Sequence, residues 1–329
     1  MSYTLGIVGA TGLVGRALIA QLQTKFLEST CYFFASDRSL GQNIVFRDAD
    51  HKVLPINDEC LDRCDILLAV TDGSISQSLI EKRWYDHVAI IDNASTFRLH
   101  PDVPLLIPEI NPDVYHGQTV IANPNCTTIQ LLLLLSPLLK HIPIGECIVS
   151  SYQSVSGTGL AAMDELTQGM RALVDDQQPQ SLLYPRPIAG NVIPQCDAFN
   201  GDWTLEELKI MNESAKILKE SVTIHPTCVR VPVYQGHHLA VTVKFNKDID
   251  RATLESIIHH QSRLTLCDRD SYPSSVAVVG SDNVFVSRMR HAPKDLSTWS
   301  FWLSADNIRV GAATNAMNIL HMIRDRCIK

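Results

Sequence analysis

Continuous apolar runs alternate with amphipathic segments along the first third of the chain. Each run ends in polar turn residues, as buried strands of a parallel sheet do, and the runs are YTLGIVGA (3–10), CYFFAS (31–36), CDILLAVTD (64–72), HVAIIDNAS (87–95) and TVIANPN (119–125). Between the first two runs, residues 13–26 carry apolar side chains at helical spacing. Strands that alternate with helices predict a doubly wound parallel sheet over residues 1–125.

The pattern changes after residue 126. Longer segments, several with period-two alternation, predict strands at ECIVSSYQSVSG (146–157), PTCVRVPVYQG (226–236), HHLAVTVKF (237–245) and TWSFWLSAD (298–306). Helical spacing predicts helices at 159–174, 204–220 and 250–263, and the proline-rich stretch 175–187 predicts a long loop. Residues 126–306 are therefore expected to form an α+β domain with a mixed or antiparallel sheet. A last amphipathic helix, about 307–329, is expected to pack back on the first domain.

Composition narrows the classes of protein that fit. The chain has 329 residues, of which 45% are hydrophobic and 19% charged, which is typical of a soluble globular protein of two domains. A formal charge of −7 argues against a general nucleic-acid role. The most apolar stretch, 129–139, is too short to span a bilayer, and the N-terminus lacks the pattern of a signal peptide. Nine irregularly spaced cysteines favour a reducing, cytoplasmic location.

Glycines crowd the turn between the first predicted strand and the first helix. Their spacing, Gly9-x-x-Gly12-x-x-Gly15, is a variant of the dinucleotide fingerprint, in which glycine lets the backbone approach a pyrophosphate at a helix N-terminus. The position between a strand and a helix favours a cofactor site over an ordinary turn. We therefore predict a Rossmann-like domain whose cofactor contacts include Gly9, Thr11, Gly12, Leu13 and Val14.

The second strand ends in residues that bear on the choice of cofactor. Ser36, Arg38 and Ser39 offer hydroxyls and a guanidinium that suit the 2′-phosphate of NADP. Asp37 lies among them, and a carboxylate there suits the ribose hydroxyls of NAD. The segment therefore predicts a nicotinamide nucleotide, and it leaves open whether the phosphate is preferred.

Cys126 follows an Asn-Pro-Asn turn and precedes a run of leucines. A thiol at a helix start is stabilised as the thiolate by free N–H groups and the helix dipole, whereas a structural cysteine normally lies inside the apolar run. Asn125 is expected to cap this helix. The position predicts that Cys126 is a nucleophile.

A cysteine nucleophile needs a proton-transfer partner, and His237 has the best context among twelve histidines. It follows a Gln-Gly turn where a side chain can face a cleft, and Arg230 precedes that turn on a predicted strand. His238, His259 and His260 fit surface or strand positions. No carboxylate or thiol lies at ligand spacing around the histidine pairs, so we expect no metal.

Taken together, these segments resemble the aspartate-semialdehyde dehydrogenase family in order and over nearly the whole chain. The matching motifs are GATGLVG (9–15), ASDRSLG (35–41), DNASTFR (92–98), VPLLIPEIN (103–111), ANPNCTT (122–128), SSYQSVSG (150–157), NVIPQCD (191–197), CVRVPVYQGHH (228–238) and DNIRVGAATNA (306–316). The resemblance implies reduction of aspartyl β-phosphate by NADPH to aspartate semialdehyde and phosphate, on the route to lysine, threonine and methionine. It also implies a cytoplasmic homodimer or homotetramer.

The resemblance also implies roles for residues that match the family's motifs. Cys126 resembles the nucleophile that forms a thioester, His237 the acid/base, and Gln153 the group that orients the acyl chain. The other implied contacts are Arg230 to the substrate carboxylate, Glu206 to its ammonium, Arg98 and Lys209 to phosphate, Asn125 to substrate, and Ser156, Gly157 and Asn307 to the cofactor near the nicotinamide.

Two positions depart from the family's commoner pattern. Asp37 replaces a small residue, which puts a carboxylate near the expected 2′-phosphate, and His238 replaces a serine beside His237.

Three alternatives to this family remain. N-acetyl-glutamyl-phosphate reductase shares the chemistry, but its motif around the nucleophile differs from Asn-Pro-Asn-Cys-Thr. Glyceraldehyde-3-phosphate dehydrogenase shares only the Cys-Thr-Thr helix start. A non-catalytic binding or scaffold homologue would be expected to have lost the cysteine, glutamine or histidine, and all three are present.

Overall fold

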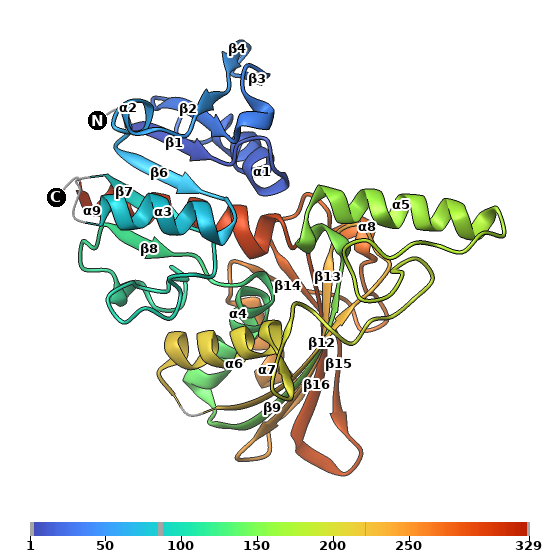
Figure 1. The fold of residues 1–329 in the computed structure, drawn as a ribbon. Coiled ribbons are helices and arrows are strands. Elements are labelled where there is room, and N and C mark those ends of the chain that lie inside the picture. The colour runs from blue at the N-terminus through green and yellow to red at the C-terminus, as the bar shows by residue number, and fades with distance from the viewer. Residues whose placement is uncertain (1–2, 85–87, 221, 328–329) are drawn as a thin grey trace. The chain divides into compact units, whose positions relative to one another are not determined.

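The computed structural model describes residues 3–84, 88–220 and 222–327 (Figure 1). The chain divides into two compact units, of which the first comprises residues 1–125 with 312–329 and the second comprises residues 126–311. Among the described residues, no helix is both long and apolar enough to cross a membrane.

The first unit is built on a parallel sheet. Its six strands follow the order β5-β2-β1-β6-β7-β8 and comprise β1 (Thr4–Val8), β2 (Thr30–Ala35), β5 (Leu54–Pro55), β6 (Ile66–Ala69), β7 (Ala89–Asp92) and β8 (Val120–Ala122). Every pairing in it is parallel. The strand order reverses direction at β1 and β6, and ligands of such sheets bind beyond the carboxyl ends of the strands at this point. The predicted doubly wound sheet is confirmed.

Helices and a small hairpin complete the first unit. They are α1 (Leu13–Leu22), α2 (Asp58–Leu61), α3 (Gly73–Arg83) and α9 (Thr314–Cys327), with the hairpin of β3 (Asn43–Phe46) and β4 (Ala49–Lys52) and the short 3-10 turns η1 (Asp37–Ser39) and η2 (Pro112–Val114). Apolar residues of α9, among them Met317 and Leu320, join Leu5, Ile7 and Phe33 of the sheet in one buried cluster. This burial fixes the C-terminal helix to the first unit. The helix begins at Thr314, because residues 309–313 form a π-helical turn.

The second unit is built on a mixed sheet, as predicted. Its order is β12-β9-β13-β16-β15-β14, with β9 (Ile144–Gln153), β12 (Thr223–Arg230), β13 (His237–Phe245), β14 (Leu264–Leu266), β15 (Val284–Ala292) and β16 (Asp295–Ala305). The two outer pairs are parallel and the inner pairs antiparallel.

Helices pack beside this mixed sheet. They are α4 (Cys126–His141), α5 (Leu160–Val174), α6 (Leu205–Leu218), α7 (Arg251–His259) and α8 (Ser275–Val278), and the unit also holds the 3-10 turn η3 (Val155–Thr158) and the hairpin of β10 (Phe199–Asn200) and β11 (Trp203–Thr204). The apolar α4 contacts β9 and β16 as well as α6 and α7 (Figure 1). Residues 175–187 form no helix or strand, which confirms the predicted loop.

Strand register brings three chemically capable residues to one end of the second sheet. Gln153 ends β9 and Arg230 ends the parallel strand β12, and the two are register partners. β13 runs antiparallel to β9 and starts with His237, and its next residue, His238, pairs with Tyr152. The end of β9, the end of β12 and the start of β13 therefore coincide.

Candidate active site

Cys126 is the first residue of α4, where the sequence predicted it. Its Sγ lies 3.9 Å from the Thr127 hydroxyl, and its side chain is partly exposed while the leucines that follow are buried. A thiolate here is stabilised by the positive end of a 16-residue helix. The thiol thus combines solvent access with a charge-stabilising position, as a nucleophile requires.

Gly311 packs against Cys126 and was not singled out from sequence. A Cβ built on Gly311 would lie 2.2 Å from the Cys126 Cβ and 2.6 Å from its Cα. No side chain fits at that distance, so glycine is required for α4 to begin where it does.

Gln153 connects α4, the helix that Cys126 begins, to α6. Its Nε2 donates to the Thr127 hydroxyl at 2.8 Å and to the Glu206 carboxylate at 3.1 Å, and the side chain is 1% exposed. The other carboxylate oxygen of Glu206 accepts from Lys209 Nζ at 3.2 Å, and Lys209 also pairs with Asp197. The predicted ammonium site and one predicted phosphate ligand are thus ion-paired with each other.

Arg230 is a buried cation at the end of β12. It is 5% exposed, and its Nη1 donates to the Ser154 carbonyl at 2.8 Å. Its Nε has no hydrogen-bond partner, and the guanidinium forms no ion pair among the described residues. The Tyr184 ring lies 5.9 Å from the guanidinium carbon, a favourable cation–π distance. A buried guanidinium with an unsatisfied donor is suited to an anionic ligand such as a carboxylate.

His237 is 1% exposed and lies beside the same cation. Its Nδ1 accepts from the Ser154 backbone N–H at 3.1 Å, and its Nε2 has no hydrogen-bond partner among the described residues. Burial is the main reason that its pKa lies well below the ordinary value, and the charges of Arg230 and His238 lower it further. The ring is therefore neutral at physiological pH.

The sequence left the role of His238 open, and the structure shows that neighbouring side chains hold its ring in place. Its two ring nitrogens lie 2.9 Å from the Ser304 hydroxyl and 2.7 Å from the Ser275 hydroxyl, and its ring stacks on Trp302. Burial lowers its pKa. With both nitrogens occupied, His238 is less suited than His237 to proton transfer with a substrate.

Asn307 ties together the turns around His237. Its Oδ1 accepts from the Gly236 N–H at 2.9 Å and from the Ser154 hydroxyl at 3.1 Å, and its Nδ2 donates to the Ser156 hydroxyl at 3.0 Å. Gly157 follows in η3, and a Cβ there would lie 3.0 Å from Arg230 Nη1. The predicted cofactor contacts Ser156, Gly157 and Asn307 thus surround the His237–Arg230 pair.

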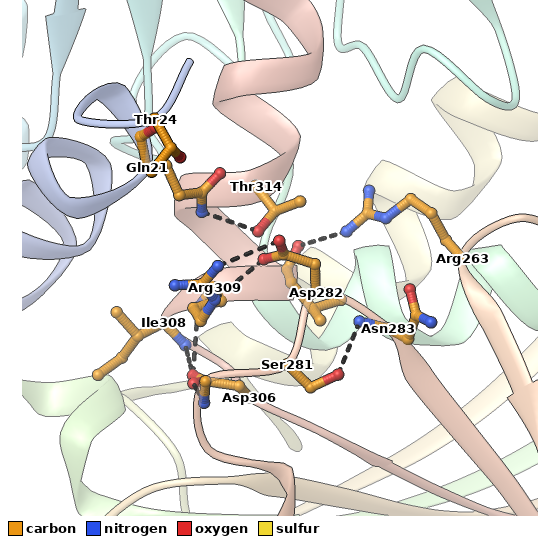
Figure 2. A network of polar contacts seen from close by, with 12 residues as sticks. Gln21, Thr24, Arg263, Ser281, Asp282, Asn283, Asp306, Ile308, Arg309 and Thr314 are labelled. Carbon is orange, nitrogen blue, oxygen red and sulfur yellow. Dashed lines mark hydrogen bonds and ion pairs between the residues drawn. The ribbon is translucent and has the colours of Figure 1, made fainter.

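Asp306, which the sequence did not single out, supports this arrangement. It is 1% exposed and accepts from Gln235 Nε2 at 2.9 Å, from the Gly280 N–H at 2.8 Å and from the Ile308 N–H at 3.0 Å. Close by, Arg309 forms a bidentate ion pair with Asp282 (Figure 2). These bonds fix the turn before His237 and the π-helical segment that contains Gly311.

In the first unit the glycine turn forms a cradle for an anion. Gly9 has a φ of +93°, and a Cβ there would lie 2.5 Å from the Val70 carbonyl oxygen. A Cβ on Gly15 would lie 2.3 Å from the Gly9 carbonyl oxygen, which explains that glycine. Gly12 caps α1 without a side-chain hydrogen bond, so the first N–H groups of the helix have no side-chain cap. These features fit a dinucleotide pyrophosphate.

The predicted ribose-end residues lie next to this cradle. The Thr11 and Ser39 hydroxyls are 3.2 Å apart, and Asp37, Arg38 and Ser39 form η1 directly after β2. Ser36 and Asp37 also line a cavity of about 480 Å³ together with residues of α2 and α3. The first unit therefore brings together the glycine turn and the groups predicted to distinguish NADP from NAD.

Amide side chains connect the segments that follow β7 and β8 in the first sheet. Asn123 Nδ2 donates to Asn93 Oδ1 at 2.9 Å, and Asn315 Nδ2 donates to Asn123 Oδ1 at 2.7 Å. Arg98 is 8% exposed and donates to the Asn93 carbonyl at 2.8 Å. Asn125, 7% exposed, ends this segment immediately before Cys126. Arg98 and Asn125 thus belong to the first unit, and the other predicted substrate ligands belong to the second.

Comparisons with known proteins agree with this geometry. A family model described as "Semialdehyde dehydrogenase, NAD binding domain" matches residues 4–118, and "Semialdehyde dehydrogenase, dimerisation domain" matches residues 135–310. The aspartate-semialdehyde dehydrogenase of Aquifex aeolicus is 36% identical, with 98% of each chain covered. That of Legionella pneumophila is 35% identical, with 97% of this chain and 95% of the relative covered.

The chain belongs to the aspartate-semialdehyde dehydrogenase family. A solved structure agrees, because aspartate semialdehyde dehydrogenase II from Vibrio cholerae, crystallised in complex with ASA, matches with a TM-score of 0.95 and 34% identity over 99% of each chain. Membership makes the protein an oxidoreductase of amino-acid biosynthesis with a nicotinamide-nucleotide-binding domain, and it confirms the resemblance seen in the sequence.

Proposed function

We propose that the protein reduces L-aspartyl 4-phosphate to L-aspartate 4-semialdehyde and phosphate, with NADPH as the reductant. The observation that carries the proposal is the grouping, in one unit, of a thiol at a helix start with Gln153, Arg230 and His237. The relatives are named aspartate-semialdehyde dehydrogenase, which supports aspartate semialdehyde as the aldehyde in the proposed reaction. The product would feed lysine, threonine, methionine, isoleucine and diaminopimelate synthesis in the cytoplasm.

Substrate recognition would use the buried charges of the second unit. Arg230 has an unsatisfied Nε and a forked geometry that matches the α-carboxylate. Glu206 would accept the α-ammonium, and its bond to Gln153 links that subsite to the helix of the nucleophile. Gln153 would orient the acyl group, and Asn125 would contact it. Arg98 and Lys209 are proposed for the phosphate by resemblance.

The chemistry would begin with the Cys126 thiolate. It attacks the acyl carbon, the new carbon–sulfur bond forms, and the bond from carbon to the phosphate oxygen breaks to leave a thioester. A nicotinamide bound here would supply the hydride that reduces this thioester. The resulting thiohemiacetal collapses when the carbon–sulfur bond breaks, which releases the aldehyde and returns the thiolate. His237 would be the acid/base that moves protons to and from the thiol and the hemiacetal oxygen.

Three groups of residues are proposed to bind the cofactor. Gly9, Thr11, Gly12, Leu13 and Val14 form the glycine turn and the helix start that suit the pyrophosphate. Ser36, Arg38 and Ser39 would bind the 2′-phosphate of NADP, and Asp37 would weaken that preference. Ser156, Gly157 and Asn307 are proposed near the nicotinamide. We propose no metal, in keeping with a thiol nucleophile and a hydride donor.

Self-association would use the apolar surface of α5. Leu160, Met170, Leu173 and Val174 are 45%, 44%, 42% and 81% exposed. Such a row of exposed apolar side chains on one helix is typical of a subunit interface, and it falls within the match to the dimerisation-domain model. We propose a homodimer, or a homotetramer built from such dimers.

Steady-state assay of the reverse reaction tests the proposed function. Purified protein with aspartate semialdehyde, phosphate and NADP should produce NADPH only when phosphate is present. N-acetylglutamate semialdehyde should give less than about a hundredth of that rate, because the buried Glu206 carboxylate is matched to an ammonium rather than an amide. Cys126→Ala should be inactive. Cys60→Ala serves as the control, because Cys60 is a partly exposed thiol of the first unit, as Cys126 is of the second. Faster turnover of the acetylated substrate would assign the protein to the rival reductase.

A further inference from the structure

One residue of the loop at 175–187 turns back toward the candidate active site. Tyr184 is partly buried, whereas every other residue between 180 and 186 is exposed. Its ring packs against a small buried apolar cluster to which η3 and α5 contribute. The ring centre also lies 5.9 Å from the guanidinium carbon of Arg230. The loop therefore reaches the residue that is proposed to bind the substrate carboxylate.

A buried carboxylate holds this loop against α5. Glu165 is 4% exposed, and its two carboxylate oxygens accept the backbone N–H groups of Leu182 at 3.3 Å and of Leu183 at 2.7 Å. Hydrogen bonds to an ionised carboxylate are roughly twice as strong as bonds between neutral groups. Because the two amides directly precede Tyr184, Glu165 fixes the backbone from which the tyrosine ring extends.

The hydroxyl of Tyr184 fixes the far end of the same side chain. It donates to the Thr158 hydroxyl at 3.0 Å, and Thr158 is the last residue of η3. Burial raises the pKa of Tyr184, so the phenol keeps the proton that it donates throughout the physiological range. The ring is thus held at both ends, at its backbone by Glu165 and at its hydroxyl by η3.

The segment that follows Tyr184 is attached to the backbone of Arg230. The Ile193 carbonyl accepts from the Arg230 N–H at 2.8 Å, and the Ile193 N–H donates to the Arg230 carbonyl at 2.9 Å. The chain from Tyr184 to Ile193 therefore meets Arg230 twice, once at the guanidinium and once at the backbone. These two attachments limit how far the ring can move relative to the cation.

The guanidinium of Arg230 is a cation that the contact can stabilise. It is 5% exposed, and its Nε has no hydrogen-bond partner among the described residues. A desolvated cation within about 6 Å of an aromatic ring is attracted by the negative face of the ring. We propose that Tyr184 is a positioning residue that holds the Arg230 guanidinium ready for the substrate α-carboxylate, and that Glu165 holds Tyr184 in turn.

This inference rests on the proposed function and gives the loop at 175–187 a part in substrate binding. A residue that positions a carboxylate ligand acts equally on bound substrate and on the transition state. Its loss therefore raises the KM for aspartate semialdehyde and leaves kcat unchanged. A desolvated cation–π contact corresponds to a factor of about 3–30 in affinity. Phosphate and NADP are proposed to bind other residues, so their KM values should not follow.

Steady-state kinetics of the reverse reaction test the positioning role. Tyr184→Leu keeps an apolar side chain in the cluster but removes the aromatic face, and it should raise the KM for aspartate semialdehyde about 3–30-fold. Tyr184→Phe keeps the ring and should recover most of that loss. Tyr272→Leu, at a tyrosine that is 63% exposed, is the matched control and should keep the wild-type KM. An unchanged KM in Tyr184→Leu, an equal rise for all three reactants, or an equal rise in Tyr184→Phe would overturn the proposal.

Glu165→Gln tests the anchor from outside the apolar cluster, and it keeps the proposal testable if Tyr184→Leu does not fold. Glutamine has one acceptor oxygen for the two loop amides, so the variant should raise the KM for aspartate semialdehyde and keep the wild-type kcat. A wild-type KM in a folded Glu165→Gln protein would contradict the anchoring of Tyr184 by Glu165.

Titration calorimetry tests the same claim without turnover. In Cys126→Ala no thioester can form, so the heat of mixing with aspartate semialdehyde reports substrate affinity alone. Addition of Tyr184→Leu should raise the Kd for aspartate semialdehyde by about 3–30-fold and leave the Kd for NADP unchanged. If the wild type did not turn over aspartate semialdehyde, the proposed function would fail. If the wild type did so while Tyr184→Leu kept its KM and Kd, this inference alone would fail.

Discussion

Substitution of Gly311 by alanine should displace Cys126, the proposed nucleophile. The added Cβ would lie 2.2 Å from the Cys126 Cβ, whereas ordinary van der Waals contact begins at 3.4 Å, so the two segments must separate by about 1.2 Å. The nearest atoms include the Cys126 Cα, which means that backbone must move and no flexible side chain can absorb the strain. A misplacement of about 1 Å at a reacting group costs ~10²-fold in rate. Overpacking of this kind also costs about 1–3 kcal/mol of folding free energy.

The assay compares kcat with thermal stability in two variants. Gly311→Ala should lose about 10²-fold in kcat and lower the Tm. Gly201→Ala is the matched control, because Gly201 has a φ of +63° and no atom within 4 Å of a built Cβ. It should lower the Tm through backbone strain alone and keep the wild-type kcat. Wild-type kcat in Gly311→Ala would refute the claim that this glycine sets the position of Cys126.

Other consequences concern stability, assembly and cofactor choice. Burial raises the pKa of Cys147 to about 12 from an unfolded value of 9.0, so its contribution to stability is complete below pH 9 and is lost as pH rises toward 12. Urea unfolding should show a loss of up to ~1.4 kcal/mol per pH unit from this thiol, and Cys147→Ala should flatten the slope. Met170→Lys with Leu173→Lys should yield monomers in sedimentation; an unchanged mass would rule out the α5 interface. Asp37→Ala should raise the ratio of kcat/KM for NADP over NAD at least about tenfold, because a like charge beside the phosphate is removed; an unchanged ratio would show that Asp37 does not face it.

Local chemistry made part of the site predictable. The glycine turn and the start of α4 at Cys126 depend on neighbouring residues, so their spacing carries the information. His237 could be proposed because it follows a glycine turn, whereas Gln153 was implied only by the resemblance of the segment SSYQSVSG to the family's motif. The parallel and the mixed sheet followed from the change in apolar pattern between the two halves of the chain.

Long-range packing made the rest unpredictable. Two contacts join segments that are far apart in sequence. Gly311 packs against Cys126 because glycine has no side chain, and the Ser154 backbone N–H donates to His237. β15 escaped prediction because its alternation is interrupted by a bulge at Arg288, which has a φ of +54°. Asp306 reads as an ordinary polar residue until the fold gathers four N–H groups around it.

A single-turnover experiment without phosphate tests the central claim most directly, that Cys126 carries the acyl group. Enzyme, NADP and aspartate semialdehyde are mixed, NADPH is followed by absorbance, and the protein is quenched for mass spectrometry. We predict a burst of one NADPH per active site, an aspartyl thioester on Cys126, and its discharge when phosphate is added. No burst, or an acyl group on any residue other than Cys126, would contradict the account.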